Sequence, residues 1–460
     1  MYDGIITNSC RDTSSFSDFP FDPERYPDYF GHRQFLQYIN EYADHFKLKA
    51  HVRLQTSVLA CTPNPDDDTW SVTVQEEGKG PEERKYDAVF AATGPLTSPY
   101  TPAFLGRELF QGEFLHSQSY RRPGRFEGKK VVLIGLGSAA VDIASELAPG
   151  CSEVHMVTRR GGWVMPRYVL GKPIEAWDNR ATQIWVPSSI SQAAQTFLLN
   201  TVQGEHPKEL KPDHAILEQN PTIRSEFVER VRNGSIKVHR TTVASITETG
   251  LELGDGTTLT ADVIMACTGY SHHGSLSYLP SDVLSNANTP PNTVDLWKMT
   301  IPLRYPNLFV IGFVELAGPA PPAVEAQARF SAAVISGRIA GAIPTPDSLE
   351  KQVRKWQTWQ AKHFVRSERH ALTEHYVTLL DGLLTPLGAN PTFGRLLGRV
   401  FTGNPWKALQ TLNAVFFGIT SSAQWRLCGQ GSDEKIARET ILRIAGGKHE
   451  FCPAEKKRFA

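Results

Sequence analysis

The chain has 460 residues, of which 40% are hydrophobic and 21% are charged, an ordinary composition for a globular protein. This length allows two or three domains with a substantial buried core. Lysine and arginine together number 48, as do aspartate and glutamate, so no overall charge draws the protein toward nucleic acid. Nucleic acid is therefore excluded as the expected partner.

The cysteines and the apolar runs restrict the class further. The six cysteines include no Cys-x-x-Cys pair, which favours a reducing compartment and indicates neither a metal site nor a dithiol redox centre. Met1 is followed by Tyr-Asp-Gly rather than by a signal peptide, and no run of about 18 apolar residues predicts a membrane span.

The first predicted elements form the first copy of an internal repeat. Residues 70–74 alternate between apolar and polar side chains as a strand does, and a turn rich in Gly, Glu and Lys follows. Residues 86–94 then predict a buried strand that contains Asp87, continues as an apolar run and ends in Thr93-Gly94.

The next predicted elements are the strand, turn and helix of a dinucleotide-binding unit. Residues 129–134 are typical of a central parallel strand, and residues 141–147 predict a helix. Between them stand Gly135, Leu136, Gly137, Ser138, Ala139 and Ala140, with alanine at the third glycine position of the fingerprint. A bare glycine pattern is more often an ordinary turn, but the flanking strand and helix favour nucleotide binding.

This turn is predicted to hold the pyrophosphate of a dinucleotide. Gly135 and Gly137 let the backbone approach the phosphates, and the helix opening offers N–H donors at its positive end. The predicted donors are Ser138, Ala139, Ala140, Val141 and Asp142.

The next strand indicates which nicotinamide cofactor is bound. Residues 153–158 end in Thr158-Arg159-Arg160, where an NAD-specific site places an acidic residue. Arg159 favours NADP(H), because a guanidinium pairs with a 2′-phosphate through two hydrogen bonds. A solvated strand end is the alternative interpretation.

The second copy of the repeat follows. Residues 235–240 and 243–247 alternate as strands, residues 254–256 predict a hairpin, and residues 262–269 predict a buried strand that ends in Thr-Gly. When the spacing of this copy is applied to the first, a first glycine fingerprint would lie before Met1. The sequence therefore predicts that an N-terminal βαβ unit of about 30 residues or more is missing.

The remaining residues predict one more buried strand over 306–313, a helix over 323–340, and a helical region from about Pro344. The aromatic side chains of this region are interpreted as packing residues rather than as a cofactor site. They are Trp356, Trp359, Trp406, Phe416, Phe417 and Trp425. Residues 455–458 are interpreted as a solvated end.

A motif ahead of the dinucleotide unit carries a resemblance to a known family. Residues 110–121 fit the pattern FxGxxxHxxxY followed by a basic residue. By spacing alone, His116 is most simply a hydrogen-bonded structural group. The segment resembles the identifying motif of the flavin-containing monooxygenases, in which it is thought to act as a linker. Tyr120 stands where Baeyer–Villiger monooxygenases usually carry Trp.

The resemblance extends over almost the whole chain. Similar segments are residues 7–9, 16–21, 162–167, 266–270, 327–329, 424–429 and 437–442. It implies an α/β fold with two interleaved dinucleotide-binding, Rossmann-like domains of the FAD/NAD(P)-binding type. The expected FAD-binding domain comprises 1–123 and 269–345, and the NADP-binding domain comprises 124–268 with a helical insertion near 176–233. A C-terminal helical region would cover 346–460.

The resemblance implies an NADPH- and FAD-dependent monooxygenase similar to N,N-dimethylaniline monooxygenase. NADPH would reduce FAD, O2 would add to the flavin, and a flavin hydroperoxide would oxygenate the soft nitrogen or sulfur of an amine or sulfide. Asn8 matches the family's asparagine near the flavin and is assigned the catalytic role, because a carboxamide forms hydrogen bonds without exchanging a proton. Thr7, Ser9 and Gln327 are carried over with it as cofactor-binding residues. Without the resemblance, Asn8 is most simply a turn residue.

Two other functions stay open. The family's first GxGxxG and the acidic residue that binds the FAD ribose have no counterpart here, which fits an NADP(H)-binding pseudoenzyme or regulatory fragment. A ketone-oxygenating enzyme is the third interpretation, and Tyr120 counts against it. Many animal members end in a hydrophobic anchor, whereas this chain ends in polar residues. The expected location is therefore cytoplasmic or associated with the endoplasmic reticulum, and peripheral membrane association stays open.

Overall fold

The computed structural model describes residues 2–339 and 341–447, which form two compact units. Unit 1 contains residues 2–8, 99–174 and 186–270, and unit 2 contains residues 9–98, 175–185 and those from 271 onward. The predicted FAD- and NADP-binding domains, with boundaries at 123, 268 and 345, stay a prediction. The tail over 455–458 lies outside the described residues.

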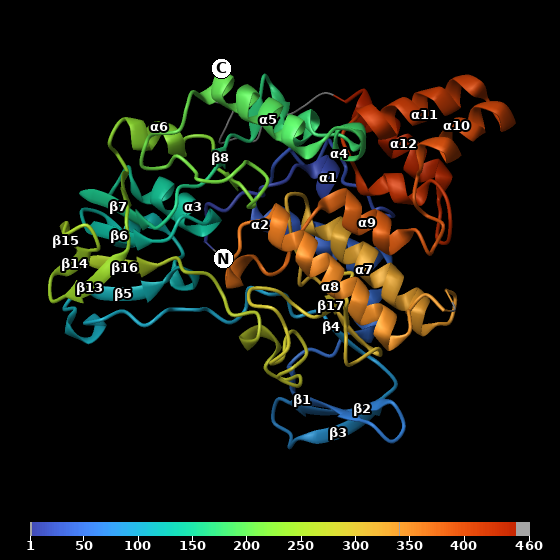
Figure 1. Ribbon diagram of the computed structural model, residues 1–460, viewed down its shortest axis with the longest axis horizontal. Helices are drawn as coiled ribbons and strands as arrows, with labels where there is room; N and C mark the ends of the chain where they lie inside the picture. The colour runs from blue at the N-terminus through green and yellow to red at the C-terminus, as the bar shows by residue number, and fades with distance from the viewer. Residues whose placement is uncertain (1, 340, 448–460) are drawn as a thin grey trace. The chain divides into compact units, whose positions relative to one another are not determined.

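Unit 1 is built on a parallel sheet with the strand order β12-β7-β6-β16-β5 (Figure 1). Its strands are β5 (Glu113–His116), β6 (Lys130–Ile134), β7 (Glu153–Thr158), β12 (Lys237–Arg240) and β16 (Val263–Ala266). The central strand β6 is apolar and buried because neighbouring strands and both covering layers exclude water from it. Helix α3 (Ser138–Leu147) joins β6 to β7 and packs its apolar face on the sheet. The predicted strand, turn and helix are confirmed.

Smaller elements complete unit 1. They are the helices α5 (Ser188–Gln203) and α6 (Phe227–Arg232), and the strands β8 (Val164–Met165), β9 (Tyr168–Val169), β10 (Lys172–Pro173), β11 (Thr222–Ile223), β13 (Val243–Thr247), β14 (Gly250–Leu253) and β15 (Thr258–Thr260). The hairpin predicted at 254–256 joins β14 to β15, and the Leu253 N–H donates to the Thr257 carbonyl at 2.8 Å.

Unit 2 contains a second parallel pair, formed by β4 (Val89–Ala91) and β19 (Leu308–Val310). Both strands are shorter than predicted, and Phe90 of β4 is exposed. Its other strands are β1 (Thr56–Asn64), β2 (Thr69–Glu76), β3 (Glu82–Tyr86), β17 (Leu296–Trp297), β18 (Ile301–Pro302), β20 (Glu315–Leu316) and β21 (Thr373–Glu374).

Unit 2 also contains helices, of which α7 (Ala320–Ile335), α8 (Pro346–His363) and α9 (Tyr376–Leu384) share a hydrophobic core with the β4–β19 pair. The others are α1 (Arg11–Ser14), α2 (His32–His45), α4 (Arg180–Trp185), α10 (Phe393–Thr402), α11 (Pro405–Phe417) and α12 (Glu434–Ala445). The predicted helical region after Pro344 is therefore present. The helix predicted over 323–340 starts earlier and ends at Ile335.

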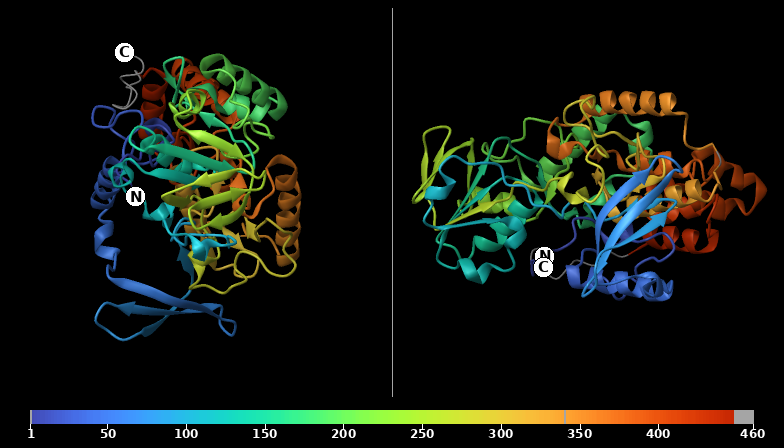
Figure 2. Two further views of the ribbon diagram at one scale, coloured as in Figure 1. Left: turned by 90° about the vertical axis from the view of Figure 1, so that its left-hand side faces the viewer. Right: turned by 90° about the horizontal axis from the view of Figure 1, so that it is seen from below.

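The predicted internal repeat is visible in both units. In each copy, a three-stranded antiparallel sheet precedes a parallel strand that leads into Thr-Gly. The first copy consists of β1 to β3 followed by β4, and the second of β13 to β15 followed by β16. Figure 2 shows the long β1–β3 ribbon of the first copy clearly.

The packing interpretation of the C-terminal aromatics is only partly right. Trp425 and Phe416 are buried, whereas Trp406 and Phe417 are exposed. The interpretation was wrong for Trp406 and Phe417 because α11 packs through its opposite face, which carries Leu412 and Val415.

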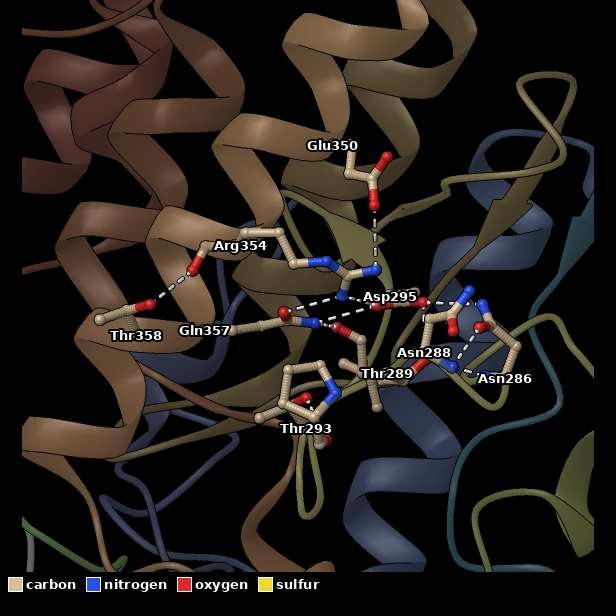
Figure 3. Close-up of polar contacts among 11 residues, drawn as sticks. Asn286, Asn288, Thr289, Thr293, Asp295, Glu350, Arg354, Gln357 and Thr358 are labelled. Atoms are coloured by element: carbon tan, nitrogen blue, oxygen red, sulfur yellow. Dashed lines mark hydrogen bonds and ion pairs between the residues drawn. The ribbon is translucent and has the colours of Figure 1, made fainter.

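A buried carboxylate holds helix α8 against the loop before β17 (Figure 3). Asp295 accepts hydrogen bonds from Arg354 Nη1 at 2.6 Å, Gln357 Nε2 at 3.0 Å, Thr289 Oγ1 at 2.6 Å and Asn286 Nδ2 at 3.1 Å. A buried charge with this many donors is stabilised, and removing it would leave buried donors without their acceptor, although Arg354 would keep its ion pair with Glu350. We assign this cluster a structural role in unit 2.

Candidate active site: a dinucleotide turn and the segment before Asn8

The turn after β6 has a geometry that only glycine allows. Gly135 has φ +123°, and a Cβ atom built on it would lie 2.4 Å from the carbonyl oxygen of Cys267. The Gly135 N–H donates to the Val157 carbonyl at 2.9 Å, so the turn is fixed between the neighbouring strands β7 and β16. The backbone thus lies open at the carboxyl end of the sheet, where dinucleotide phosphates bind in such folds.

The start of α3 narrows the predicted donor set. Gly137 is the extended N-cap, and helix α3 begins at Ser138, which is exposed. The N–H of Val141 donates to the Gly137 carbonyl at 3.0 Å, so Val141 and Asp142 already lie within the helical hydrogen-bond pattern. The backbone donors that point outward belong to Ser138, Ala139 and Ala140. The Val141 N–H is therefore used within the helix, and cofactor contact by Val141 and Asp142 stays a prediction.

Two arginines stand at the end of the sheet where a 2′-phosphate would lie. Arg159 is exposed directly after β7 and forms no ion pair within the part of the chain that the structure describes. Arg240 ends β12 and pairs in register with Thr158. Its Nη2 lies 3.8 Å from Asp213, and its Nη1 donates to the Lys211 carbonyl at 3.0 Å. Sequence reasoning missed Arg240 because only the pairing of β12 with β7 brings it opposite Thr158, the residue before Arg159.

The motif at residues 110–121, which precedes β6, is held by hydrogen bonds to the Thr-Gly turn after β16 and to helix α3. His116 Nδ1 accepts the N–H of Gln118 at 3.1 Å, which leaves Nε2 to donate to the Gly269 carbonyl at 3.0 Å. Burial lowers the pKa of His116, which keeps the imidazole neutral. Tyr120 donates to Glu146 of α3 at 2.8 Å. The structure therefore gives His116 the structural role that spacing alone suggested.

The segment before Asn8 belongs to unit 1 and is bonded to it. Arg167 donates from Nε to the Thr7 carbonyl at 3.1 Å and from Nη2 to the Ile6 carbonyl at 3.3 Å. Asn8 is exposed, while Ser9 is the first residue of unit 2 and its Oγ lies 2.8 Å from the Oγ of Ser14. The structure thus places Thr7 and Asn8 in the same unit as the glycine turn.

Gln327 has protein partners at both ends of its carboxamide. It is fully buried in α7, its Oε1 accepts the Gly312 N–H at 2.8 Å, and its Nε2 donates to the Met299 carbonyl at 2.6 Å. These bonds tie α7 to the end of β19 and to the β17–β18 hairpin. They describe a packing role, and cofactor contact by Gln327 stays a prediction.

The comparison with known sequences decides the family. The profile of the flavin-binding monooxygenase-like family matches residues 1–448. The chain belongs to this family. Flavin-containing monooxygenase 5 of Oryctolagus cuniculus is 32% identical over 457 residues, which cover 96% of this chain and 82% of the relative. Dimethylaniline monooxygenase [N-oxide-forming] 2 of Mus musculus is 31% identical, with 96% and 82% covered. The chain is thus an FAD- and NADPH-dependent flavin-containing monooxygenase.

A solved structure supports the fold. S-allyl-L-cysteine S-oxygenase from Allium sativum matches with a TM-score of 0.61 at 20% identity, over 96% of this chain and 84% of that one. At that identity the likeness shows the shared fold, and the predicted dinucleotide-binding α/β class is confirmed.

The described residues of this flavin-containing monooxygenase fit NADPH at the glycine turn. The close approach at Gly135, the outward donors that open α3 and the cation of Arg159 supply the chemistry that a pyrophosphate and a 2′-phosphate require. Among those same residues, no group of three or more His, Cys, Asp or Glu side chains could hold a metal ion. No helix within 2–339 or 341–447 is long and apolar enough to cross a bilayer.

Proposed function

We propose that this flavin-containing monooxygenase oxygenates soft nitrogen or sulfur atoms of small amines and sulfides. One relative is named for forming N-oxides and one structural neighbour for S-oxygenation. In such a reaction one oxygen atom of O2 goes to the substrate and the other leaves as water, with two electrons from NADPH. Bound FAD supplies this redox chemistry, and the residues of the chain bind the cofactors, orient the reacting groups and shield them from water.

The observation that carries the proposal is the glycine turn with Arg159 beside it. The N–H groups of Ser138, Ala139 and Ala140 would bind the pyrophosphate, while Gly135 and Gly137 allow the approach.

The 2′-phosphate would meet cations on both neighbouring strand ends. Thr158 directs the chain at the end of β7 by donating from Oγ1 to the Arg160 carbonyl at 2.6 Å. Arg159 and Arg240 would then reach the 2′-phosphate from β7 and β12.

Asn8 is the proposed catalytic residue. Its carboxamide can both accept and donate a hydrogen bond but has no acidic proton to give. Such a group can orient a reactive oxygen without protonating it. Protonation would instead divert the oxygen into hydrogen peroxide. Thr7 and Ser9 stay proposed as its cofactor-binding neighbours. His116 takes no part in proton transfer, because both of its ring nitrogens are occupied by the backbone.

A turnover assay tests this function. The full chain, loaded with FAD, is incubated with NADPH, O2 and N,N-dimethylaniline, a methyl aryl sulfide or cyclohexanone, and products are measured together with oxygen uptake. We expect N-oxide and sulfoxide in proportion to the NADPH consumed. Ester formation from the ketone alone would replace the proposal with a ketone oxygenase. NADPH binding without flavin retention or turnover would replace it with a pseudoenzyme.

We also propose that the protein attaches peripherally to membranes. Phe401 and Trp406 flank the loop between α10 and α11 and are 82% and 71% exposed. No acidic residue occurs between Asp381 and Asp433, whereas Arg395 and Lys407 lie in these helices together with Arg399, which pairs with Glu434 at 3.0 Å. Exposed aromatics beside basic residues suit an anionic lipid surface. Sedimentation with phosphatidylserine vesicles tests this, and equal binding by a chain carrying F401S and W406S would exclude the surface.

A further inference from the structure

Arg167 is a buried cation whose hydrogen bonds reach the backbone immediately before Asn8. It lies between β8 and β9, and its own N–H donates to Ser225 Oγ at 3.1 Å. Its carbonyl accepts from Ile174 at 2.9 Å. The backbone of Arg167 is therefore fixed, and its planar guanidinium extends a rigid fork to the carbonyls of Ile6 and Thr7.

The same N-terminal segment is bonded to the helix that follows the glycine turn. Tyr2 donates from its hydroxyl to Asp142 Oδ2 at 2.6 Å, and Asp3 donates its N–H to the Arg121 carbonyl at 2.9 Å. Asp142 is buried in α3 and pairs with Arg224 at 3.3 Å. The positive charge of Arg167 also acts on the Asp142 carboxylate. One network thus links the segment at residues 2–7 to α3 within unit 1.

A buried arginine is a costly way to satisfy two carbonyls. Taking a cation out of water carries a penalty that is repaid only when partners and geometry are fixed. The Asp142 carboxylate, which pairs with Arg224, adds a favourable electrostatic interaction with Arg167, and the Ile6 and Thr7 carbonyls receive directed hydrogen bonds. These bonds fix the position of the backbone at Ile6 and Thr7, which directly precedes Asn8.

We propose that Arg167 is a positioning residue for Asn8. It holds the Ile6 and Thr7 carbonyls, and thereby the Asn8 carboxamide, in a fixed place on the unit that carries the glycine turn. This rests on the proposed function of Asn8. It adds that the position of Asn8 is set from the NADPH-binding unit, through Arg167 and the Asp142 network.

The experiment compares R167Q and R167K with the parent chain, and uses R232Q as a matched control. Arg232 belongs to the same unit and also donates to a backbone carbonyl, that of Glu205 at 2.7 Å, far along the chain from Asn8. Two quantities are measured on each full chain. One is amide hydrogen exchange of peptides covering residues 5–9, and the other is the fraction of NADPH electrons released as hydrogen peroxide.

We expect R167Q to speed exchange over residues 6–9 roughly tenfold, the size of one lost charged hydrogen bond, and to raise the peroxide fraction. NADPH affinity should change less than about twofold, R167K should restore part of both signals, and R232Q should leave both unchanged. Unchanged exchange in R167Q would overturn the inference. If R167Q does not fold, the exchange rate of residues 6–9 in R167K tests the inference instead. A lysine ammonium lacks the planar arrangement of donors, so R167K should still exchange faster than the parent chain, and an unchanged rate would overturn the inference.

The variant N8A separates this inference from the proposed function. If N8A leaves the peroxide fraction unchanged, the role of Asn8 fails, while the exchange data still judge the contacts of Arg167. If N8A raises the peroxide fraction and R167Q does not, the positioning role fails and the role of Asn8 stands.

Discussion

The close approach at Gly135 gives the sharpest prediction of a single substitution. In G135A the new Cβ would lie 2.4 Å from the Cys267 carbonyl oxygen, well inside van der Waals contact. That carbonyl cannot move cheaply, because Cys267 follows strand β16, which is paired on both sides, and donates its N–H to the Ile134 carbonyl at 2.9 Å. The φ of +123° adds backbone strain of about 1–3 kcal/mol, and overpacking adds a similar amount.

We therefore expect G135A to lose about 4 kcal/mol of unfolding free energy. The matched control is G256A, because Gly256 also has a positive φ of +86° but no atom within 4 Å of its Cβ position. That variant should lose only about 1–2 kcal/mol, from strain alone. Urea denaturation of both variants measures the difference.

The same substitution should weaken NADPH binding at least about tenfold, since the displaced turn loses a hydrogen bond to a charged phosphate. G256A should bind NADPH as the parent does. Equal stability losses in the two variants, together with unchanged NADPH affinity in G135A, would refute the close-approach argument.

Three further outcomes follow from single side chains. R159Q should weaken NADPH binding about 10- to 100-fold and leave NADH binding unchanged, as titration of both cofactors would reveal. D295A should lower the free energy of unfolding by about 1–3 kcal/mol, because buried donors lose their acceptor while Arg354 keeps its ion pair with Glu350; a loss under 1 kcal/mol in urea melts would contradict the network. Burial raises the pKa of Glu374 to about 7, so the folded state holds this proton more tightly than the unfolded state does. Stability should therefore fall by about 3 kcal/mol as pH rises from 4.5 to 7, and E374Q should flatten that part of the pH profile; an unaltered profile would exclude Glu374 as its source.

The sequence predicted the dinucleotide unit almost residue by residue, because its signals are local. The apolar run of β6, the two glycines and the helix that follows depend on near neighbours, and β7 has its predicted bounds of 153–158. The internal repeat could also be predicted from the sequence, because each copy has its own turn residues and ends in Thr-Gly.

The remaining features depend on contacts between distant residues. Arg240 lies opposite Thr158 only because β12 pairs with β7, and Arg167 donates to the carbonyls of Thr7 and Ile6, which lie 160 and 161 residues earlier in the sequence. Neither contact can be predicted from the residue types alone. The exposure of Trp406 likewise follows from which face of α11 packs, because hydrophobicity alone does not distinguish a core aromatic from a surface one.

The proposed flavin-dependent oxygenation depends on selection of NADPH by the turn at Gly135 and the cation at Arg159. Calorimetric titration of the purified chain with NADPH and with NADH measures that selection. We expect NADPH to bind at least about tenfold more tightly than NADH, the value of one charged hydrogen bond to the 2′-phosphate. Equal affinity for the two cofactors, or binding of neither, would contradict it.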